Sequence, residues 1–388
     1  MLKIKLDYYL LHIKAFLISI LFFYKDISNK KIVIDNFLGK GYGDNLKYIV
    51  EELNKNNLNL KIVWIVRNIN EEMPTYIKKV KYGSFLAMYE YYTAKLWIDN
   101  VRNNIKPSKR KGQIYLQTWH GPFSSKKIEK LAEKSLSREY IKEAKKDGCE
   151  IDAILSNSKM QDNQYIDYFW LSNNVEILKF GFPRNDYLIK NQKNYSLIKK
   201  IKKKLKLNDD DYLILYAPTF RDDFTIEGYK LEFKQILKTF EQKTKKKCKL
   251  LVRLHPNVYK YSGFIKYNDD IIDITPYPNM QDLSLVCDVI ISDYSSTLFD
   301  FAIQQKPAFR CALDLEHYMH IRGLVDEYFN YPFPFAKDNN ELLEEILEFD
   351  YLDYTKKINE FFKENPIYDK GNSTKKIVNW ICEKIKVK

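Results

Sequence analysis

The stretch VIISDYSSTLFDFAI (residues 289–303) decides the fold. It opens with a short apolar run typical of a buried strand and ends with apolar residues at helical spacing, and the polar SDYSS lies between the two. A serine-rich turn of this kind places hydroxyls and unpaired helix N–H groups where both can face a phosphate. An ordinary serine N-cap is the simpler alternative. We therefore predict a strand, an anion-binding loop with Ser295 and Ser296, and a helix whose Asp300 accepts a hydrogen bond from a ligand hydroxyl.

The sequence around this stretch has the same layout. Apolar runs end in polar loops at DYLILYAPTFR (211–221) and CKLLVRLHP (248–256), with a helical pattern between them. In the second loop Arg253 and His255 are two residues apart, which puts them on one face of a strand end as a cationic pair suited to a diphosphate. Pro256 is expected to end that strand. In the first loop Thr219 and Arg221 follow a strand, although an ordinary turn would also explain them.

The first half of the chain repeats the alternation. Strands are predicted at 30–37, 60–66, the end of 85–98, 114–119, 151–158 and 175–180, with a glycine-rich turn, GKGYGDN (39–45), before an amphipathic helix. Strands separated by helical segments imply parallel βαβ units. We expect two doubly wound α/β domains joined near residue 190, binding ligands at the carboxyl ends of their strands across a cleft.

Length, charge and cysteine usage agree with this organisation. A chain of 388 residues favours two domains, and a formal charge of +13 favours phosphate-rich or anionic-lipid partners. The lysine runs 199–206 and 243–249 lack the interleaved aromatics of a nucleic-acid groove, so no nucleic-acid partner is predicted. The five cysteines are scattered without CxxC spacing, which indicates a reducing, cytoplasmic compartment.

The N-terminal segment YYLLHIKAFLISILFFY (8–24) is apolar but short for a membrane span, and it contains two potentially charged side chains. We interpret it as an interfacial helix at an anionic membrane surface, with Lys3, Lys5, Lys14 and Lys25 near the headgroups. A helix packed on its own domain is the alternative. The predicted division is a membrane-associating helix at 1–28, an acceptor-side domain at 29–195 and a donor-binding domain at 196–388, whose last helices can cross back.

The ordered set TWHG, SNS, GFPRND, YAPTFR, RLHP and SDYSSTLFDFA, over about residues 30–330, resembles the CDP-glycerol glycerophosphotransferase family of teichoic-acid and capsule polymer synthases and primases. The resemblance implies a GT-B-like fold of two Rossmann-like domains. It also implies transfer of glycerol phosphate from CDP-glycerol to a hydroxyl of a lipid-linked or polymer acceptor, with release of CMP, at the cytoplasmic face of the cell membrane. The chain departs from the family pattern after His120, where HGPFSSK replaces the usual HGT continuation.

The resemblance also implies a set of site residues. His120 is expected to be the general base, because a neutral imidazole can accept a proton near pH 7, and His255 is expected to steady the departing CMP. Lys126 or Lys127 is expected near the phosphates. The full CDP-glycerol-binding set is His120, Gly121, Pro122, Phe123, Ser124, Arg184, Pro218, Thr219, Arg221, Arg253, Leu254, His255, Ser295, Ser296 and Asp300.

No metal or other cofactor is predicted. Asp222 and Asp223 are expected to lie in a loop, and His317 and His320 are read as ordinary polar residues. A CDP-ribitol ribitolphosphotransferase and a GT-B nucleotide-sugar glycosyltransferase are the alternative enzymes, and a non-catalytic, basic nucleic-acid-binding or membrane-binding protein is a distant third. The sequence leaves open the acceptor, primase or polymerase action, and the oligomeric state.

Overall fold

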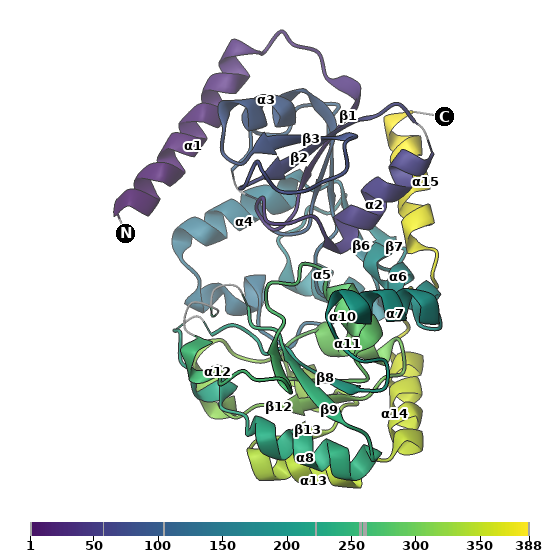
Figure 1. The fold of residues 1–388 in the computed structure, drawn as a ribbon. Coiled ribbons are helices and arrows are strands. Elements are labelled where there is room, and N and C mark those ends of the chain that lie inside the picture. Colours follow the sequence, from purple (N-terminus) through teal and green to yellow (C-terminus); the bar gives the residue numbers. More distant parts are fainter. Residues whose placement is uncertain are drawn as a thin grey trace. The chain divides into compact units, whose positions relative to one another are not determined.

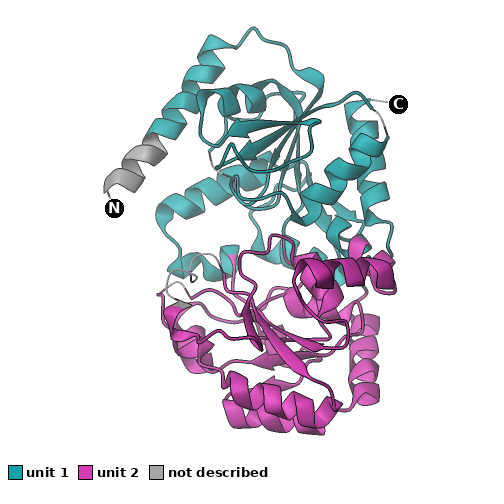
Figure 2. Ribbon diagram, viewed as in Figure 1, with its two compact units in different colours: residues 1–120, 129–186, 367–388 teal, residues 121–128, 187–366 magenta. Residues whose placement is uncertain are grey.

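The structure, a computed structural model, describes residues 2–56, 58–103, 105–221, 223–255, 258 and 262–386, with side chains from residue 10 onward. The chain forms two compact units (Figures 1 and 2). Unit 1 comprises Met1–His120, Glu129–Asp186 and Ile367–Lys388, and unit 2 comprises Gly121–Ile128 and Tyr187–Pro366.

Unit 1 is built on a parallel sheet with the order β3-β2-β1-β4-β5-β6-β7 within the described residues. Parallel neighbours need crossover connections, which here are mostly helices on the faces of the sheet. The strands are β1 (Ser28–Asp35), β2 (Lys61–Val66), β3 (Ile77–Lys81), β4 (Ala94–Asp99), β5 (Ile114–Gln117), β6 (Ala153–Ser156) and β7 (Glu176–Lys179). The helices are α1 (Leu2–Leu21), α2 (Asp44–Lys55), α3 (Phe85–Thr93), η1 (Glu129–Ser135), α4 (Arg138–Glu150), α5 (Lys159–Tyr168), the start of α6 (Pro183–Asn191) and α15 (Ser373–Ile385).

Unit 2 repeats this arrangement with the parallel order β10-β9-β8-β11-β12-β13 in the part of the chain that the structure describes. Its strands are β8 (Tyr212–Tyr216), β9 (Cys248–Val252), β10 (Ile271–Asp273), β11 (Val289–Ser292), β12 (Ala308–Cys311) and β13 (Phe335–Ala336). Its helices are α7 (Tyr195–Lys204), η2 (Glu227–Tyr229), α8 (Phe233–Thr244), η3 (Ser262–Phe264), α10 (Met280–Val286), α11 (Thr297–Ala302), α12 (Leu315–Ile321), η4 (Asp326–Asn330), α13 (Asn339–Glu348) and α14 (Tyr351–Glu364).

The predicted pair of doubly wound α/β domains is confirmed by these two sheets. Some elements differ from the sequence prediction. The loop expected over GFPRND becomes α6 from Pro183, because proline is well suited to the first turn of a helix. The polar, lysine-rich segment at 191–210 contains α7, and strands β3, β12 and β13 were not predicted.

Three segments group differently from a division at 195/196: 121–128 and 187–195 fall in unit 2, and 367–388 falls in unit 1. Residues 121–128 belong to unit 2, where the ring of Phe123 is buried 4.2 Å from that of Phe299. The C-terminal helix α15 belongs to unit 1, because Ile377 and Ile381 are fully buried in the core that α2 shares with the sheet. The first and the last of these segments therefore follow the apolar surface that they cover.

Helix α1 packs on α3 through one face. Ala15 and Ile18 are buried with Met88 and Tyr92, and the ring of Phe22 contacts that of Tyr89. The other face exposes large apolar side chains, namely Leu10, Ile13, Phe16, Leu17, Ile20 and Leu21, followed by Phe23 and Tyr24. Within the described residues, no helix combines the length and apolar character needed to cross a membrane.

Candidate active site

His120 lies at the carboxyl end of β5, next to the topological switch point between β1 and β4, where doubly wound sheets bind ligands. Its Nδ1 lies 2.8 Å from the carbonyl oxygen of Asn100. A carbonyl oxygen only accepts, so Nδ1 carries the proton and the basic lone pair of the neutral ring is on Nε2. This is the tautomer that a base acting through Nε2 requires.

The loop that carries His120 is held from several sides. Trp119 has a left-handed backbone (φ 52°), and its carbonyl accepts a hydrogen bond from Asn45 (3.3 Å). The Arg184 guanidinium donates to the carbonyl of His120 (2.8 Å) and pairs with Asp44 (3.3 Å). A left-handed non-glycine residue costs energy and persists only where the surrounding contacts fix it. Arg184, predicted as a ligand contact, is placed here as a support for the His120 loop.

The glycine-rich turn before α2 resembles a phosphate-binding loop, but several of its N–H groups have acceptors within the protein. Gly39 donates to the carboxylate of Asp35 (2.6 Å). Glu71 accepts from the next glycine and from the tyrosine after it. Because the chain supplies its own carboxylates here, we do not assign a donor phosphate to this turn.

In unit 2, Gly121 and Ser296 lie in close approach. A Cβ atom added to Gly121 would lie 3.0 Å from the Ser296 hydroxyl oxygen, so a larger residue here would require the serine side chain to move. Phe123 is buried between Phe299 and the ring of Phe361, and the carbonyl of Ser124 accepts from Tyr331 (2.8 Å). Of the HGPFSSK segment that departs from the family pattern, Phe123 is thus a packing anchor in unit 2.

A cavity of about 270 Å³ in unit 2 is lined in part by predicted donor contacts. Four predicted residues, Pro218, Thr219, His255 and Ser295, line it together with Lys126. The imidazole of His255 stacks on the ring of Phe220 (centroids 5.3 Å apart). Phe220, Tyr318 and Arg322 complete the lining and were missed by the sequence reasoning. Two long cations and a histidine around a small cavity with hydroxyls suit a diphosphate.

Four predicted residues of unit 2 are buried or hydrogen-bonded within the protein. Arg253 donates to the carbonyl of Tyr277 (2.7 Å), and its burial lowers its pKa to about 10, so it remains a cation at pH 7. Leu254 is buried in the core of unit 2. Asp300 is 2% exposed in α11, and Ser295 shares a hydrogen bond with Thr297 (2.9 Å). Pro256 and Asp222 lie outside the described residues.

Arg221 is buried in a clamp of two carboxylates. Its Nε and Nη2 each lie 2.7 Å from an oxygen of Asp314, and its Nη1 lies 2.7 Å from Asp293. Asp293 also accepts from the backbone N–H of Thr219 (2.8 Å) and of Tyr294 (2.6 Å). The clamp therefore joins the loop after β8 to the loop after β11. Arg221 supports the cavity by holding the loops that carry its lining residues.

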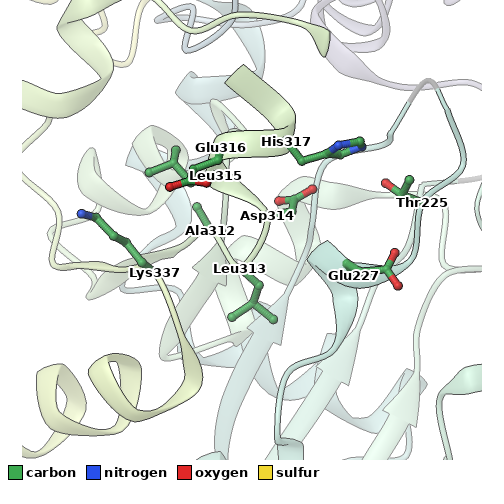
Figure 3. Close-up of a pocket in the computed structure, with 9 residues that line it drawn as sticks. All are labelled: Thr225, Glu227, Ala312, Leu313, Asp314, Leu315, Glu316, His317 and Lys337. Carbon is green, nitrogen blue, oxygen red and sulfur yellow. The ribbon is translucent and has the colours of Figure 1, made fainter. Parts of the chain in front are cut away.

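A second cavity of about 680 Å³, drawn in Figure 3, lies in unit 2 between the loop at Thr225 and the start of α12. Its charged lining includes both signs, with Glu227 and Glu316 opposed by Lys337. Asp314 is occupied by the Arg221 clamp, and His317 pairs with Asp223 (2.7 Å). None of the predicted binding residues is among the nine that line this cavity, whereas four of them line the smaller one.

Comparison with known proteins gives a consistent result. A family model described as CDP-Glycerol:Poly(glycerophosphate) glycerophosphotransferase matches residues 17–383. A teichoic acid poly(glycerol phosphate) polymerase of Staphylococcus epidermidis is 29% identical over 375 residues, covering 93% of this chain but only 52% of that protein. The chain thus spans about half the length of this relative. A teichoic acid glycerol-phosphate transferase of Staphylococcus aureus is 30% identical over 339 residues, covering 84% of this chain and 85% of that protein.

A solved structure of the wall teichoic acid polymerase TagF, an amino-acid variant soaked with CDPG, is also similar. The TM-score is 0.85 at 27% identity, with 96% of this chain and 93% of that chain covered. Together with the two parallel sheets, these similarities confirm the predicted family and the predicted GT-B-like class of two Rossmann-like domains.

Proposed function

Because the chain belongs to the CDP-glycerol:poly(glycerophosphate) glycerophosphotransferase family, we propose that it transfers glycerol phosphate from CDP-glycerol to an acceptor hydroxyl and releases CMP. The observation that carries the proposal is the hydrogen bond from His120 Nδ1 to the Asn100 carbonyl, which gives the base its reactive tautomer. The acceptor is a lipid-linked or polymeric alcohol in teichoic-acid-like or capsule polymer synthesis.

In the proposed reaction, an acceptor hydroxyl attacks the phosphorus that bears glycerol. The new P–O bond forms as the bond from this phosphorus to the oxygen bridging the two phosphates breaks, and CMP leaves with the bonding electrons. Nε2 of His120 takes the hydroxyl proton. The donor cavity supplies the cations Lys126 and Arg322, and a hydrogen bond from His255, for the charge that develops on the leaving group.

The hydroxyls of Thr219 and Ser295 and the carboxylate of Asp300 are assigned to donor orientation. Thr219 and Ser295 line the cavity on loops that Asp293 joins. Holding a substrate in register is a large part of phosphoryl-transfer catalysis, because the reaction depends on in-line geometry and charge stabilisation. Arg221 and Arg184 are assigned supporting roles, since each grips a loop that carries site residues.

The exposed face of α1 is proposed to bind the cytoplasmic surface of the cell membrane peripherally. Support comes from its row of exposed apolar side chains, with Phe16 at 65% and Phe23 at 71% exposure, and from the neighbouring exposed Phe85 and Leu86 of α3. An apolar face flanked by lysines favours the headgroup region of anionic membranes. Contact with the membrane would bring the enzyme to a lipid-linked acceptor.

The test is a donor panel. Purified protein is incubated with a lipid-linked acceptor and CDP-glycerol, CDP-ribitol or a set of nucleotide sugars, and the released nucleotide and the product mass are measured. CMP release with CDP-glycerol and a gain of one or more glycerol phosphate units is expected. CMP release with CDP-ribitol alone would move the donor to ribitol, and release of a nucleoside diphosphate would indicate a glycosyltransferase. No turnover with any donor would refute the proposal.

A further inference from the structure

Two buried asparagines that the sequence reasoning did not select lie beside His120. Asn36 and Asn100 directly follow β1 and β4, whose last residues, Asp35 and Asp99, are paired in register. The two amides are 2% and 0% exposed. Nδ2 of Asn100 donates to Oδ1 of Asn36 (2.8 Å), so the side chains join the two strand ends at the switch point of the sheet.

The other hydrogen bonds of the two amides fit the same assignment of their oxygen and nitrogen atoms. Oδ1 of Asn100 accepts from the N–H of Phe37 (2.8 Å), and Nδ2 of Asn36 donates to the carbonyls of Lys40 (2.8 Å) and Gly41 (3.1 Å). Each position therefore uses one donor and one acceptor group on the same side chain. An amide provides both, whereas a carboxylate would provide only acceptors.

The pair acts on His120 from two directions. The backbone carbonyl of Asn100 accepts the Nδ1 proton of His120 (2.8 Å). The ring of Phe37, whose N–H is held by Asn100, meets the imidazole edge-on with centroids 5.5 Å apart. Phe37 has a left-handed backbone (φ 46°), a conformation that needs such support.

We propose that the Asn36–Asn100 amide pair is the positioning device that fixes the orientation and tautomer of the His120 imidazole. Neither side chain touches substrate in this account. Both act through the strand ends, by holding the Asn100 carbonyl and the Phe37 ring against the imidazole. The proposal deepens the proposed function, because it rests on His120 being the base.

The first measurement does not depend on activity. Protein labelled with ¹⁵N-histidine gives the protonation of both ring nitrogens by NMR, and His120→Gln assigns the His120 signals among the five histidines. We expect wild-type His120 to carry its proton on Nδ1 above its titration range. Asn100→Ala and Asn36→Ala are expected to shift a measurable fraction to the Nε2–H tautomer, because the acceptor and the packed ring are no longer fixed.

The second measurement is kinetic. With CDP-glycerol, both variants are expected to lose about 10-fold to 100-fold in kcat, the scale of a misplaced or misoriented catalytic group. The KM for the donor is expected to stay within about twofold of wild type, because the cavity assigned to the donor lies in unit 2. A general loss of folded protein would instead lower the active fraction and leave the tautomer of the remaining folded molecules unchanged.

Two further variants keep the test decisive. The near-isosteric Asn100→Asp retains an acceptor for Phe37 but cannot donate to Asn36. It takes the place of Asn100→Ala if that variant fails to fold, and it should shift the tautomer in the same direction. Asn157→Ala removes an equally buried amide that follows β6 and donates to Asp369 (3.0 Å), and it should leave the His120 tautomer as in wild type.

The outcomes separate the two proposals. An unchanged tautomer in every folded Asn36 and Asn100 variant, or an unchanged kcat, would overturn the positioning role. A tautomer shift in a protein that turns over none of the donors would uphold the effect of the amide pair on the imidazole and refute the proposed reaction.

Discussion

Arg221→Met tests whether the buried clamp supports the donor cavity. The substitution keeps an unbranched side chain but removes the cation between Asp293 and Asp314, all three of which are only 2% exposed in their side chains. Two buried carboxylates are then left without their partner. Breaking a buried ion pair from one side costs about 3–5 kcal/mol in the free energy of unfolding. Arg221→Lys keeps the charge but loses the two-pronged contact with Asp314, so a smaller loss of about 1–3 kcal/mol is expected.

The unfolding assay must resolve the two units. All five tryptophans lie in unit 1, so their fluorescence follows that unit, whereas circular dichroism at helical wavelengths follows both. Urea unfolding of Arg221→Met should show an early transition by circular dichroism that precedes the fluorescence change. Lys230→Met is the matched control, because the Lys230–Glu227 pair (3.1 Å) is exposed and solvent screening leaves it little effect on stability.

The same variant should lose donor affinity, since Asp293 holds the N–H group of Thr219, which lines the cavity, and that of Tyr294, which precedes the lining residue Ser295. Calorimetry with CDP at pH 7.5 measures this loss on the folded protein, below the first unfolding transition. Unfolding curves and CDP affinity that match wild type would refute the clamp as a support of the site.

Three further predictions concern other parts of the chain. His120→Ala should lower turnover by about 10²-fold to 10⁴-fold with donor affinity little changed, whereas His255→Ala should weaken donor binding as well. Single-turnover rates and equilibrium binding measure both effects. Equal affinity losses in the two variants would contradict the assignment of His120 as the base. Replacing Phe16 and Ile20 with glutamate should reduce sedimentation with anionic vesicles without lowering turnover of a soluble acceptor, and undiminished sedimentation would place the membrane contact elsewhere. Burial raises the pKa of Asp369 to about 7, so the folded chain binds the carboxyl proton more tightly than the unfolded chain does. This proton stabilises the fold fully below about pH 4, and the stabilisation is lost as the pH rises through 7. Asp369→Asn should flatten that part of the stability–pH curve, and an unchanged slope in urea unfolding would count against it.

The sheets and the main donor loops were predictable because their signals are local. An apolar run that ends in polar residues marks both a strand and the edge where ligands bind, and Thr219, His255 and Ser295 were found in this way. Strands β3, β12 and β13 were missed: β3 (IKKVK) is mostly lysine, β12 (AFRC) contains an arginine, and β13 has only two residues.

The rest of the site depends on contacts between distant residues. Whether Arg221 faces a ligand or a carboxylate is decided by Asp314, 93 positions away. Tyr318 reaches the cavity because its ring stacks on Tyr294 at 3.8 Å, a contact that depends on how α12 packs. No spacing rule in the sequence reports pairings of this kind.

The order in which the chain visits its two units limits how such a protein can be rearranged. It passes between them four times, at 120/121, 128/129, 186/187 and 366/367. A single crossover between two related genes can therefore exchange no unit intact: a junction near residue 187 would bring the unit 2 segment 121–128 and the α15 of unit 1 from opposite parents. Hybrids that combine one parent's unit 1 with the other's unit 2 need all four junctions at once, so we expect the two units to diverge together. Single-junction chimaeras should fold poorly unless the cores that receive Phe123 and Ile377 accommodate these side chains.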